Sequence, residues 1–156
     1  MPVATLAARP DLLPTVAAWL WEEFWRHDGC TLAETAAIYA GCVAPVGAPQ
    51  TFVVLDNGAP VATATLARHD LDERPNLSPW LAGVYVVPAA RGQGHARTAI
   101  AAVEAAIQAA GIPAAWLYTS TAEGLYARLG WHAVEQVPRT GNTPVTLMRK
   151  GFGPAA

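Results

Sequence analysis

Residues that could bind a phosphate-containing ligand are concentrated in one short segment, residues 87–97. Gly92 and Gly94 lie directly before a predicted helix, where glycine allows a tight turn and lets a ligand approach the backbone without meeting a Cβ atom. The free N–H groups of the first helical turn, together with the helix dipole, attract an anion. Arg91 adds a fixed positive charge that suits phosphate. The segment therefore predicts an anion site without metal, the alternative being an ordinary glycine-rich turn.

Three nucleotide-binding motifs can be compared with this segment. A Walker loop requires a Lys and a Ser or Thr after its last glycine, and neither is present. A dinucleotide fingerprint requires Gly or Ala where this chain has Arg97. The pattern R-x-x-G-x-A is satisfied by Arg91, Gly94 and Ala96. A second motif, A-x-x-L-Y-x-x-L-G-[FW], is matched by residues 122–131 and contains Tyr126.

Both motifs resemble those of the GNAT superfamily of N-acetyltransferases, the first its coenzyme A loop and the second the segment that closes the same site. The resemblance is clear over about residues 61–131. It implies that acetyl-CoA is the co-substrate and that its pantetheine arm lies between two splayed strands. It also implies that Tyr126 lies near the thiol and acts as the general acid that protonates the departing thiolate. The alternative for Tyr126 is a core aromatic residue.

The same resemblance implies the residues that contact the cofactor. A backbone N–H from the strand would hold the thioester oxygen, and the loop would hold the pyrophosphate. Thr119 lies seven residues before Tyr126, where many members have Asn, so its amide-donor role is missing here. The full set is Val84, Tyr85, Val86, Arg91, Gly92, Gln93, Gly94, His95, Ala96, Arg97 and Thr119. No metal ligand is expected among them.

A general base is harder to place. Some members of the superfamily carry Glu on the strand before the tyrosine helix, but the matching position here is close to Ala114 and no carboxylate lies on that strand. We take Glu22 as the candidate base or acceptor contact. Each option could instead be a solvated surface residue, and the full set is Glu22, Glu23, His27, Asp28, His69 and Asp70.

An aromatic cluster occupies the first predicted helix. Trp21 and Trp25 share a helix face, and tryptophan rings beside carboxylates suit a cationic amine. Trp80 precedes the phosphate-loop strand and could form another wall of such a pocket. The alternative for these residues is core packing.

The elements that must position these residues follow from periodicity and from turn residues. Asp11 can cap the first helix, whereas Thr31 and Glu34 form a capping box for the second. Asn57-Gly58 predicts a hairpin, and Gly83 indicates a bulge or a close backbone approach. Helices are predicted at 11–27, 31–39, 95–110 and 121–129. Strands are predicted at 3–8, 50–55, 61–67, 81–87, 114–118, 131–137 and 143–149.

This order predicts an α/β fold with a mixed sheet. The strand, helix and strand in the middle should form a right-handed crossover between two parallel strands, while the hairpins make their neighbours antiparallel. The resemblance implies a GNAT-like fold, with six to seven strands, about four flanking helices and splayed middle strands. We expect one domain over residues 1–150 and a frayed tail over residues 151–156.

Composition limits the other functions. The chain has 156 residues, 53% of them hydrophobic, and a net charge of -2, so nucleic acid is not expected as a partner. Cys30 and Cys42 are too few for a disulfide framework, and no leader or spanning segment is visible, which predicts a cytoplasmic protein away from membranes. The oligomeric state stays open, a homodimer included.

These observations predict an acetyl-CoA-dependent N-acetyltransferase. The acetyl group would pass directly to a primary amine of a small molecule or peptide in a ternary complex. A covalent acetyl-cysteine route is disfavoured, because neither cysteine lies near the motifs or has a visible His partner. The alternative is a non-catalytic acyl-CoA-binding or sensing protein of the same fold.

Overall fold

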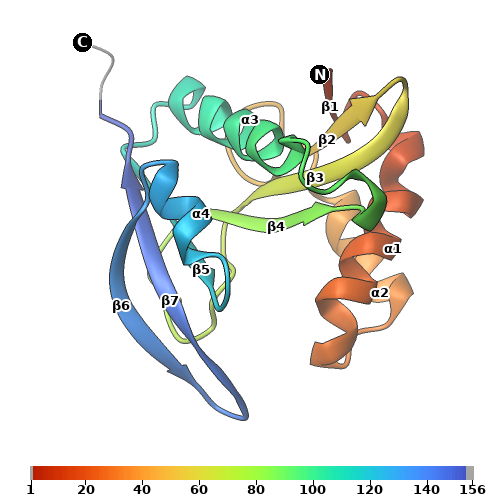
Figure 1. Cartoon of the computed structure of the whole chain (residues 1–156). Coiled ribbons are helices and arrows are strands. Elements are labelled where there is room, and N and C mark those ends of the chain that lie inside the picture. The colour runs from red at the N-terminus through yellow and green to blue at the C-terminus, as the bar shows by residue number, and fades with distance from the viewer. Residues whose placement is uncertain (1, 154–156) are drawn as a thin grey trace.

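Strands and helices follow one another along the chain in the order that the sequence predicts. The structure is a computed structural model that describes residues 2–153. Within these residues it has seven strands and four α-helices (Figure 1). The strands are β1 (Val3–Thr5), β2 (Gln50–Asp56), β3 (Ala59–Ala67), β4 (Trp80–Val86), β5 (Ala114–Thr119), β6 (His132–Arg139) and β7 (Asn142–Gly151). The α-helices are α1 (Leu13–Glu23), α2 (Leu32–Ala40), α3 (His95–Ala109) and α4 (Glu123–Arg128), and short 3-10 turns are η1 (Pro10–Leu12), η2 (Trp25–Asp28) and η3 (Pro88–Ala90).

All seven strands form one mixed sheet in the order β1-β2-β3-β4-β5-β7-β6. The pair β4–β5 is parallel and is connected through α3, whereas the other neighbouring pairs are antiparallel. A crossover helix between parallel strands and hairpins elsewhere is the arrangement expected from the connection lengths. The predicted fold class is therefore confirmed.

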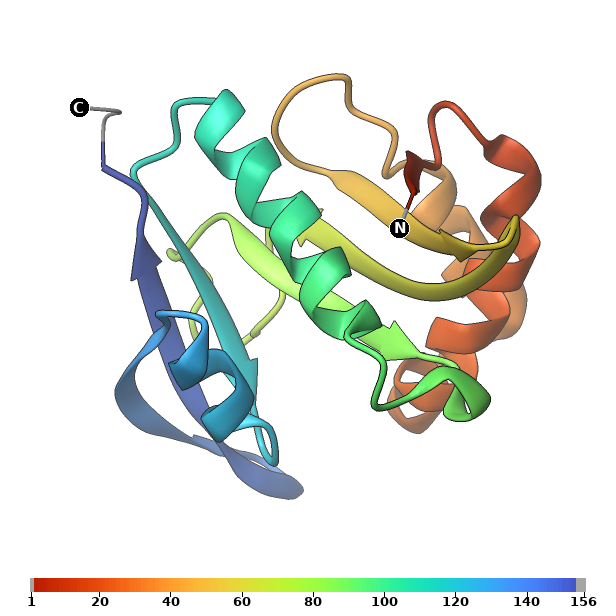
Figure 2. The same cartoon turned by 45° about the horizontal axis from the view of Figure 1, so that its top comes forward.

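The sheet opens between β4 and β5. Their register contains a single pair, Trp80 with Trp116, at the start of both strands. Beyond that point the two strands diverge, and the sheet divides into two halves that form a V (Figures 1 and 2). The edge of β4 that faces β5 therefore carries backbone N–H and C=O groups without a strand partner.

A bulge in β4 lies beside this opening. Thr65 pairs with Ala82 and Thr63 pairs with Tyr85, so β4 has one residue more than β3 over the same stretch. Gly83 lies in the bulge with φ of +60°, a left-handed conformation that glycine adopts without a steric penalty. The bulge predicted from Gly83 is confirmed.

The two faces of the sheet are covered by different helices. Helices α3 and α4 lie on one face, and α1 and α2 lie on the opposite face of the β4 half (Figure 2). On the α3 face, Ile100 and Val103 pack against Leu66 and other buried strand residues. On the opposite face, Leu20 and Tyr39 form a second core with strand β2. The sheet thus separates two hydrophobic cores, one beneath α3 and one beneath α1 and α2.

The first helix differs from its prediction. Instead of running over residues 11–27, α1 ends at Glu23, where Phe24 leaves helical geometry with φ of -123°, and a 3-10 turn follows. Trp25 is the first residue of this turn, and its indole N–H donates to the Tyr39 hydroxyl on α2 at 3.0 Å. The prediction that Asp11 caps the helix is also wrong, because its carboxylate pairs with Arg9 instead. The capping box of Thr31 with Glu34 is confirmed.

The C-terminal boundary lies later than predicted. Strand β7 extends to Gly151, and the N–H of Phe152 donates to the Pro113 carbonyl at 2.7 Å. The Phe152 ring is 7% exposed and packs edge-on against Trp131. Residues 151 and 152 are therefore part of the sheet and its core, contrary to the expected fraying. The rest of the predicted tail, apart from Gly153, lies outside the described residues.

Candidate active site

The predicted phosphate loop connects the end of β4 to the start of α3. It turns through η3 and then through Gly92 and Gly94, whose φ angles of +79° and +84° are left-handed. A Cβ atom built on either glycine would have no heavy atom within 4 Å. The loop therefore presents its backbone to open space rather than packing against the protein.

A row of unpaired backbone donors follows from this geometry. The first hydrogen bond of α3 runs from the Thr98 N–H to the Gly94 carbonyl at 3.1 Å, and no side chain caps the helix. Within residues 2–153, the N–H groups of residues 92–97 donate no hydrogen bond. Consecutive free donors at a helix N-terminus form an anion site. The predicted loop contacts of Gln93, Ala96 and Arg97 belong to this row.

The side chains of the loop have different positions. Arg91 is exposed, and its Nε donates to the Val86 carbonyl at 3.0 Å while its guanidinium lies over the Tyr85 ring. The positive charge of Arg91 is thus held beside the last residues of β4. His95 is only 2% exposed, and both of its ring nitrogens lack a hydrogen-bond partner in the described residues. A contribution of His95 to the anion site would come from its backbone N–H.

The end of β4 directs its residues to both faces. Val84 and Val86 are half-buried against the α3 core, whereas Tyr85 packs toward α1, with its ring 5.6 Å from that of Trp19. All three lie on the strand that separates from β5. Their backbone is the part of β4 that lies directly after the bulge at Gly83.

Tyr126 lies on α4, on the same face as α3. The residue is 8% exposed and belongs to the core cluster beneath α3. Burial raises the pKa of its phenol to about 12, so the hydroxyl stays protonated at neutral pH. Within the described residues its hydroxyl makes no hydrogen bond, yet it is not among the fully enclosed polar atoms. The phenol is thus a proton donor without an internal acceptor.

Helix α4 is short and depends on its neighbours for its position. Lys150 on β7 donates to the Leu129 carbonyl at 2.7 Å and pairs with Glu104 of α3 at 2.5 Å. The Trp131 indole donates to the same carboxylate at 3.3 Å. This network ties the C-terminal end of α4 to α3, and Tyr126 with it.

Thr119 ends β5 and turns the chain into α4. Its Oγ1 accepts a hydrogen bond from the Ala122 N–H at 3.0 Å. The hydroxyl is therefore engaged in the turn that leads to Tyr126. Its predicted cofactor contact stays a prediction.

The predicted acceptor residues are not brought together. Trp25 donates from Nε1 to the Tyr39 hydroxyl at 3.0 Å, whereas Trp21 donates to the Cys30 carbonyl at 2.8 Å. Glu22 is exposed and faces Arg26 at 3.5 Å. Trp80 has no exposed surface and packs in the core, which does not agree with a wall of an open pocket. Of the four, Trp25 is connected to the bulge in β4, because the Tyr39 hydroxyl that it contacts lies against Gly83.

Side chains that sequence reasoning missed lie on the face opposite α3. Tyr39 comes from α2, and its hydroxyl oxygen is 3.5 Å from the position that a Cβ of Gly83 would occupy. Tyr118 lies on β5, with Trp80 at 6.3 Å and the Arg139 guanidinium at 5.3 Å from its ring. Burial raises the pKa of both phenols, that of Tyr118 to about 12. Neither tyrosine belongs to a motif, so only the fold reveals them.

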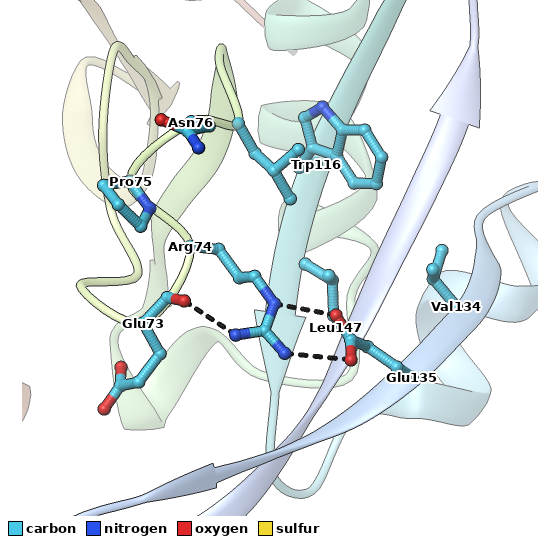
Figure 3. A pocket seen from close by; sticks show the side chains of 9 residues that line it. Glu73, Arg74, Pro75, Asn76, Trp116, Val134, Glu135 and Leu147 are labelled. Atoms are coloured by element: carbon cyan, nitrogen blue, oxygen red, sulfur yellow. Dashed lines mark hydrogen bonds and ion pairs between the residues drawn. The ribbon is translucent and has the colours of Figure 1, made fainter.

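The loop between β3 and β4 lies over this same face. Leu71 is buried against β6 and β7, and Arg74 reaches across to Glu135 with two hydrogen bonds of 2.7 and 2.9 Å (Figure 3). Glu73 faces Arg139 at 3.5 Å. Beneath the loop is a hollow of about 370 Å³, which Trp116 and Leu147 also line (Figure 3). These contacts anchor the loop to the β6–β7 half of the sheet.

The described residues offer neither a metal-binding cluster nor a membrane-spanning helix. Between residues 2 and 153, His, Cys, Asp and Glu side chains do not gather in any group of three or more that could hold a metal ion. In the same part of the chain, no helix combines the length and the apolar character needed to cross a membrane.

Comparison with known proteins identifies the family. A model described as an acetyltransferase (GNAT) domain matches residues 48–133, more than half of the chain. The chain belongs to the GNAT acetyltransferases. No curated protein sequence matches it.

Solved structures share the fold at low sequence identity. An aminoglycoside 6'-N-acetyltransferase complexed with coenzyme A has a TM-score of 0.78 at 13% identity, covering 100% of this chain and 99% of that one. One from Enterococcus faecium has a TM-score of 0.74 at 13% identity, with the same coverage. A putative acetyltransferase from Salmonella typhimurium with acetyl-CoA has a TM-score of 0.73 at 16% identity, covering 100% and 96%. At these identities the likeness shows the fold alone.

Proposed function

We propose that this chain transfers the acetyl group of acetyl-CoA directly to a primary amine within a ternary complex. The observation that carries the proposal is the opening between β4 and β5, because the free N–H row follows the end of β4 and the helix of Tyr126 follows the end of β5. Structural neighbours that hold coenzyme A or acetyl-CoA support the choice of donor. Neighbours that act on aminoglycosides support an amine acceptor.

The chain's own residues supply three functions toward acetyl-CoA. The N–H groups of residues 92–97 and Arg91 suit the pyrophosphate, with no metal required. A free N–H after the bulge, in the stretch from Val84 to Val86, would stabilise the oxyanion, a contribution of about 10²–10³ in rate. Tyr126 would donate its proton to the departing thiolate. We propose the predicted cofactor residues in these roles.

Direct transfer is favoured over a covalent acetyl-cysteine. Cys42 is buried and its Sγ contacts the Ile38 carbonyl at 3.4 Å. Burial raises the pKa of its thiol, which lowers the fraction of reactive thiolate. Cys30 follows η2, and its carbonyl accepts a hydrogen bond from the Trp21 indole. Cys30 is far from Tyr126 in the sequence and lies beside α1, whereas Tyr126 lies on α4.

The proposal is tested by thiol release from acetyl-CoA over a panel of amines: kanamycin, spermidine, lysine and a peptide with a free N-terminus. We expect release with at least one amine and a product heavier by one acetyl group in mass spectrometry. Calorimetry of acetyl-CoA binding, with and without a chelator, runs beside it. Binding without release for every amine would favour a non-catalytic acyl-CoA sensor instead, and loss of binding in chelator would contradict the metal-free loop.

A further inference from the structure

Asp70 is a carboxylate without a partner on the face of the sheet opposite α3. It belongs to the loop between β3 and β4, and the next residue, Leu71, is buried in the core that anchors this loop. The Asp70 side chain is only partly exposed. Within residues 2–153 the Asp70 carboxylate forms neither a side-chain hydrogen bond nor an ion pair. The guanidinium of Arg139 pairs with Glu73 instead.

The residue after Asp70 places this carboxylate next to β5, on the face of the sheet opposite α3. Leu71 is buried in a cluster against which Tyr118 of β5 packs. Tyr118 lies two residues beyond the single β4–β5 pair, where the two strands separate. On the other side of this opening, the Tyr39 hydroxyl lies against Gly83 in the bulge of β4. The charge of Asp70 raises the pKa of both phenols, which agrees with a carboxylate on this face.

The surroundings of Asp70 bring the pKa of its carboxyl group close to neutral pH. Burial raises its pKa to about 7, the nearby Arg139 lowers it, and the carboxylates of Asp72 and Asp28 raise it. The remaining groups that face it, Tyr39 and Tyr118, stay neutral because their own pKa values are raised. A base is most effective when its pKa is close to the working pH.

We propose that Asp70 is the general base that takes a proton from the ammonium group of the acceptor. This inference rests on the proposed function and deepens it. It assigns the acceptor as a primary alkylammonium that enters from the face of α1 and α2, where carboxylates and aromatic rings gather. It also assigns the missing base to a loop rather than to the strand before the tyrosine helix.

The proton balance of the reaction is complete with these residues. Asp70 takes one proton from R–NH₃⁺, and the free amine forms a C–N bond with the acetyl carbonyl. The C–S bond breaks as the intermediate collapses, and Tyr126 gives its proton to the thiolate. The nitrogen loses its second proton to water, and water returns a proton to Tyr126. The net products are the amide, the free thiol of coenzyme A and one proton, which leaves from Asp70.

The other candidate bases are positioned less well. Glu22 is exposed and faces Arg26 at 3.5 Å, which leaves it neither desolvated nor unpaired. Glu23, His27 and His69 are exposed as well. Their exposure to solvent distinguishes these side chains from Asp70, which is only partly exposed.

The test is the pH dependence of thiol release from acetyl-CoA, with kanamycin and spermidine as acceptors, for the wild type and for Asp70→Asn. We expect kcat/KM of the wild type to rise with pH through about 7. In Asp70→Asn this limb disappears, and kcat at pH 8 falls by about 100-fold or more. Asp70→Glu should restore part of the rate. Asp56→Asn, the same change at the β2–β3 hairpin, is the matched control and should keep the limb.

A second measurement does not depend on any acceptor. Carboxyl ¹³C NMR of aspartate-labelled protein, with Asp70→Asn to assign the signal, should show a midpoint near 7. A midpoint near the ordinary value of about 4, or an unchanged pH limb in Asp70→Asn, overturns the proposal for Asp70 alone. If the wild type binds acetyl-CoA but acetylates neither acceptor nor any other amine of the panel, the proposed function fails and the base fails with it.

Discussion

The acid and the base proposed for this protein lie on opposite faces of the sheet, and the surroundings on each face set their pKa values. Tyr126 is enclosed by the α3 core, and burial raises the pKa of its phenol to about 12. Asp70 belongs to the loop over the other face, and partial burial raises its pKa to about 7. Desolvation acts on both groups by disfavouring the charged form. As a result, the phenol stays a donor at neutral pH while the carboxylate can exchange its proton.

Replacing Tyr126 with Phe tests the acid. The ring remains in the core, so the fold and the ground-state affinity for acetyl-CoA should survive, whereas kcat should fall by about 100-fold because water replaces the phenol poorly. Single-turnover kinetics with an accepted amine measure the chemical step. A rate within twofold of the wild type would make Tyr126 a packing residue. A large rise in the Kd of acetyl-CoA with unchanged chemistry would make it a contact of the pantetheine arm.

Trp25 links the first helices to the bulge through the Tyr39 hydroxyl, so its loss should be felt by the acceptor. We expect Trp25→Phe to raise the KM of the amine several-fold and to leave the Kd of acetyl-CoA unchanged, because the indole N–H no longer orients Tyr39. Steady-state kinetics and calorimetry separate the two. Trp21→Phe is the comparison, since its indole binds the Cys30 carbonyl instead. Equal effects from both variants would point to the helix as a whole.

The identity of the base shows what residue types alone do not predict. Six acidic or histidine side chains fit the chemistry, and Glu22 is the one next to Trp21 in the sequence. Its exposure and its proximity to Arg26 became visible only in the fold. The burial of Asp70 depends on Leu71, which anchors the loop in a core formed by β6 and β7, more than sixty residues further along the chain.

At the scale of elements, the phosphate loop is the part most fully predicted from the sequence. Glycines with positive φ, a helix without an N-cap side chain and a preceding strand are local features, and each is encoded within residues 84–97. His95 is the exception, because its buried imidazole has no partner. The first helix was predicted less well, since the break at Phe24 depends on contacts of Trp21 and Trp25 with distant segments.

Gly94 should be essential for cofactor binding but not for folding. A Cβ atom at this position has no protein atom within 4 Å, and we expect a Val side chain there to occupy the space in front of the free N–H row. The φ of +84° adds strain of about 1–2 kcal/mol. We therefore expect Gly94→Val to lose acetyl-CoA binding in calorimetry while its circular dichroism remains native.

A matched control is available at the other end of the same helix. Gly111 has φ of +69° and also has no atom within 4 Å of a Cβ position. Gly111→Val should suffer a similar loss of stability and bind acetyl-CoA normally. If Gly94→Val also binds normally, the loop is not the pyrophosphate site.

At the scale of the whole molecule, the division of the sheet separates the two groups that we propose as acid and base. The crossover through α3 makes β4 and β5 parallel neighbours, as the sequence predicts, but their register ends after one pair. The charged and phenolic groups that influence Asp70 come from segments that lie far apart in the chain, at Asp28, Tyr39, Tyr118 and Arg139. No periodicity or motif connects these segments. Their meeting depends on β7 inserting between β5 and β6, which brings β6 beneath the loop that carries Asp70.

The buried carboxylate should also lower the stability of the whole fold in a pH-dependent way. In the folded state the pKa of Asp70 is raised to about 7, whereas in the unfolded chain it is about 4. Between these values the folded state binds the extra proton, so the free energy of unfolding decreases as pH rises from about 4 to about 7 and is constant above. Asp70→Asn removes this loss.

We therefore expect the stabilities of Asp70→Asn and the wild type to differ least near pH 4.5 and most above pH 7. One pKa unit corresponds to about 1.4 kcal/mol, and because the side chain keeps some contact with solvent, we expect Asp70→Asn to be more stable by about 2 kcal/mol at pH 8. For a chain of this length that is a rise in Tm of about 4–8 °C. Urea unfolding at pH 4.5 and pH 8 measures the difference. Equal stability at both pH values would mean that Asp70 is solvated in the folded protein, whereas a stabilised but inactive Asp70→Asn is the result expected of a group kept for chemistry at the expense of stability.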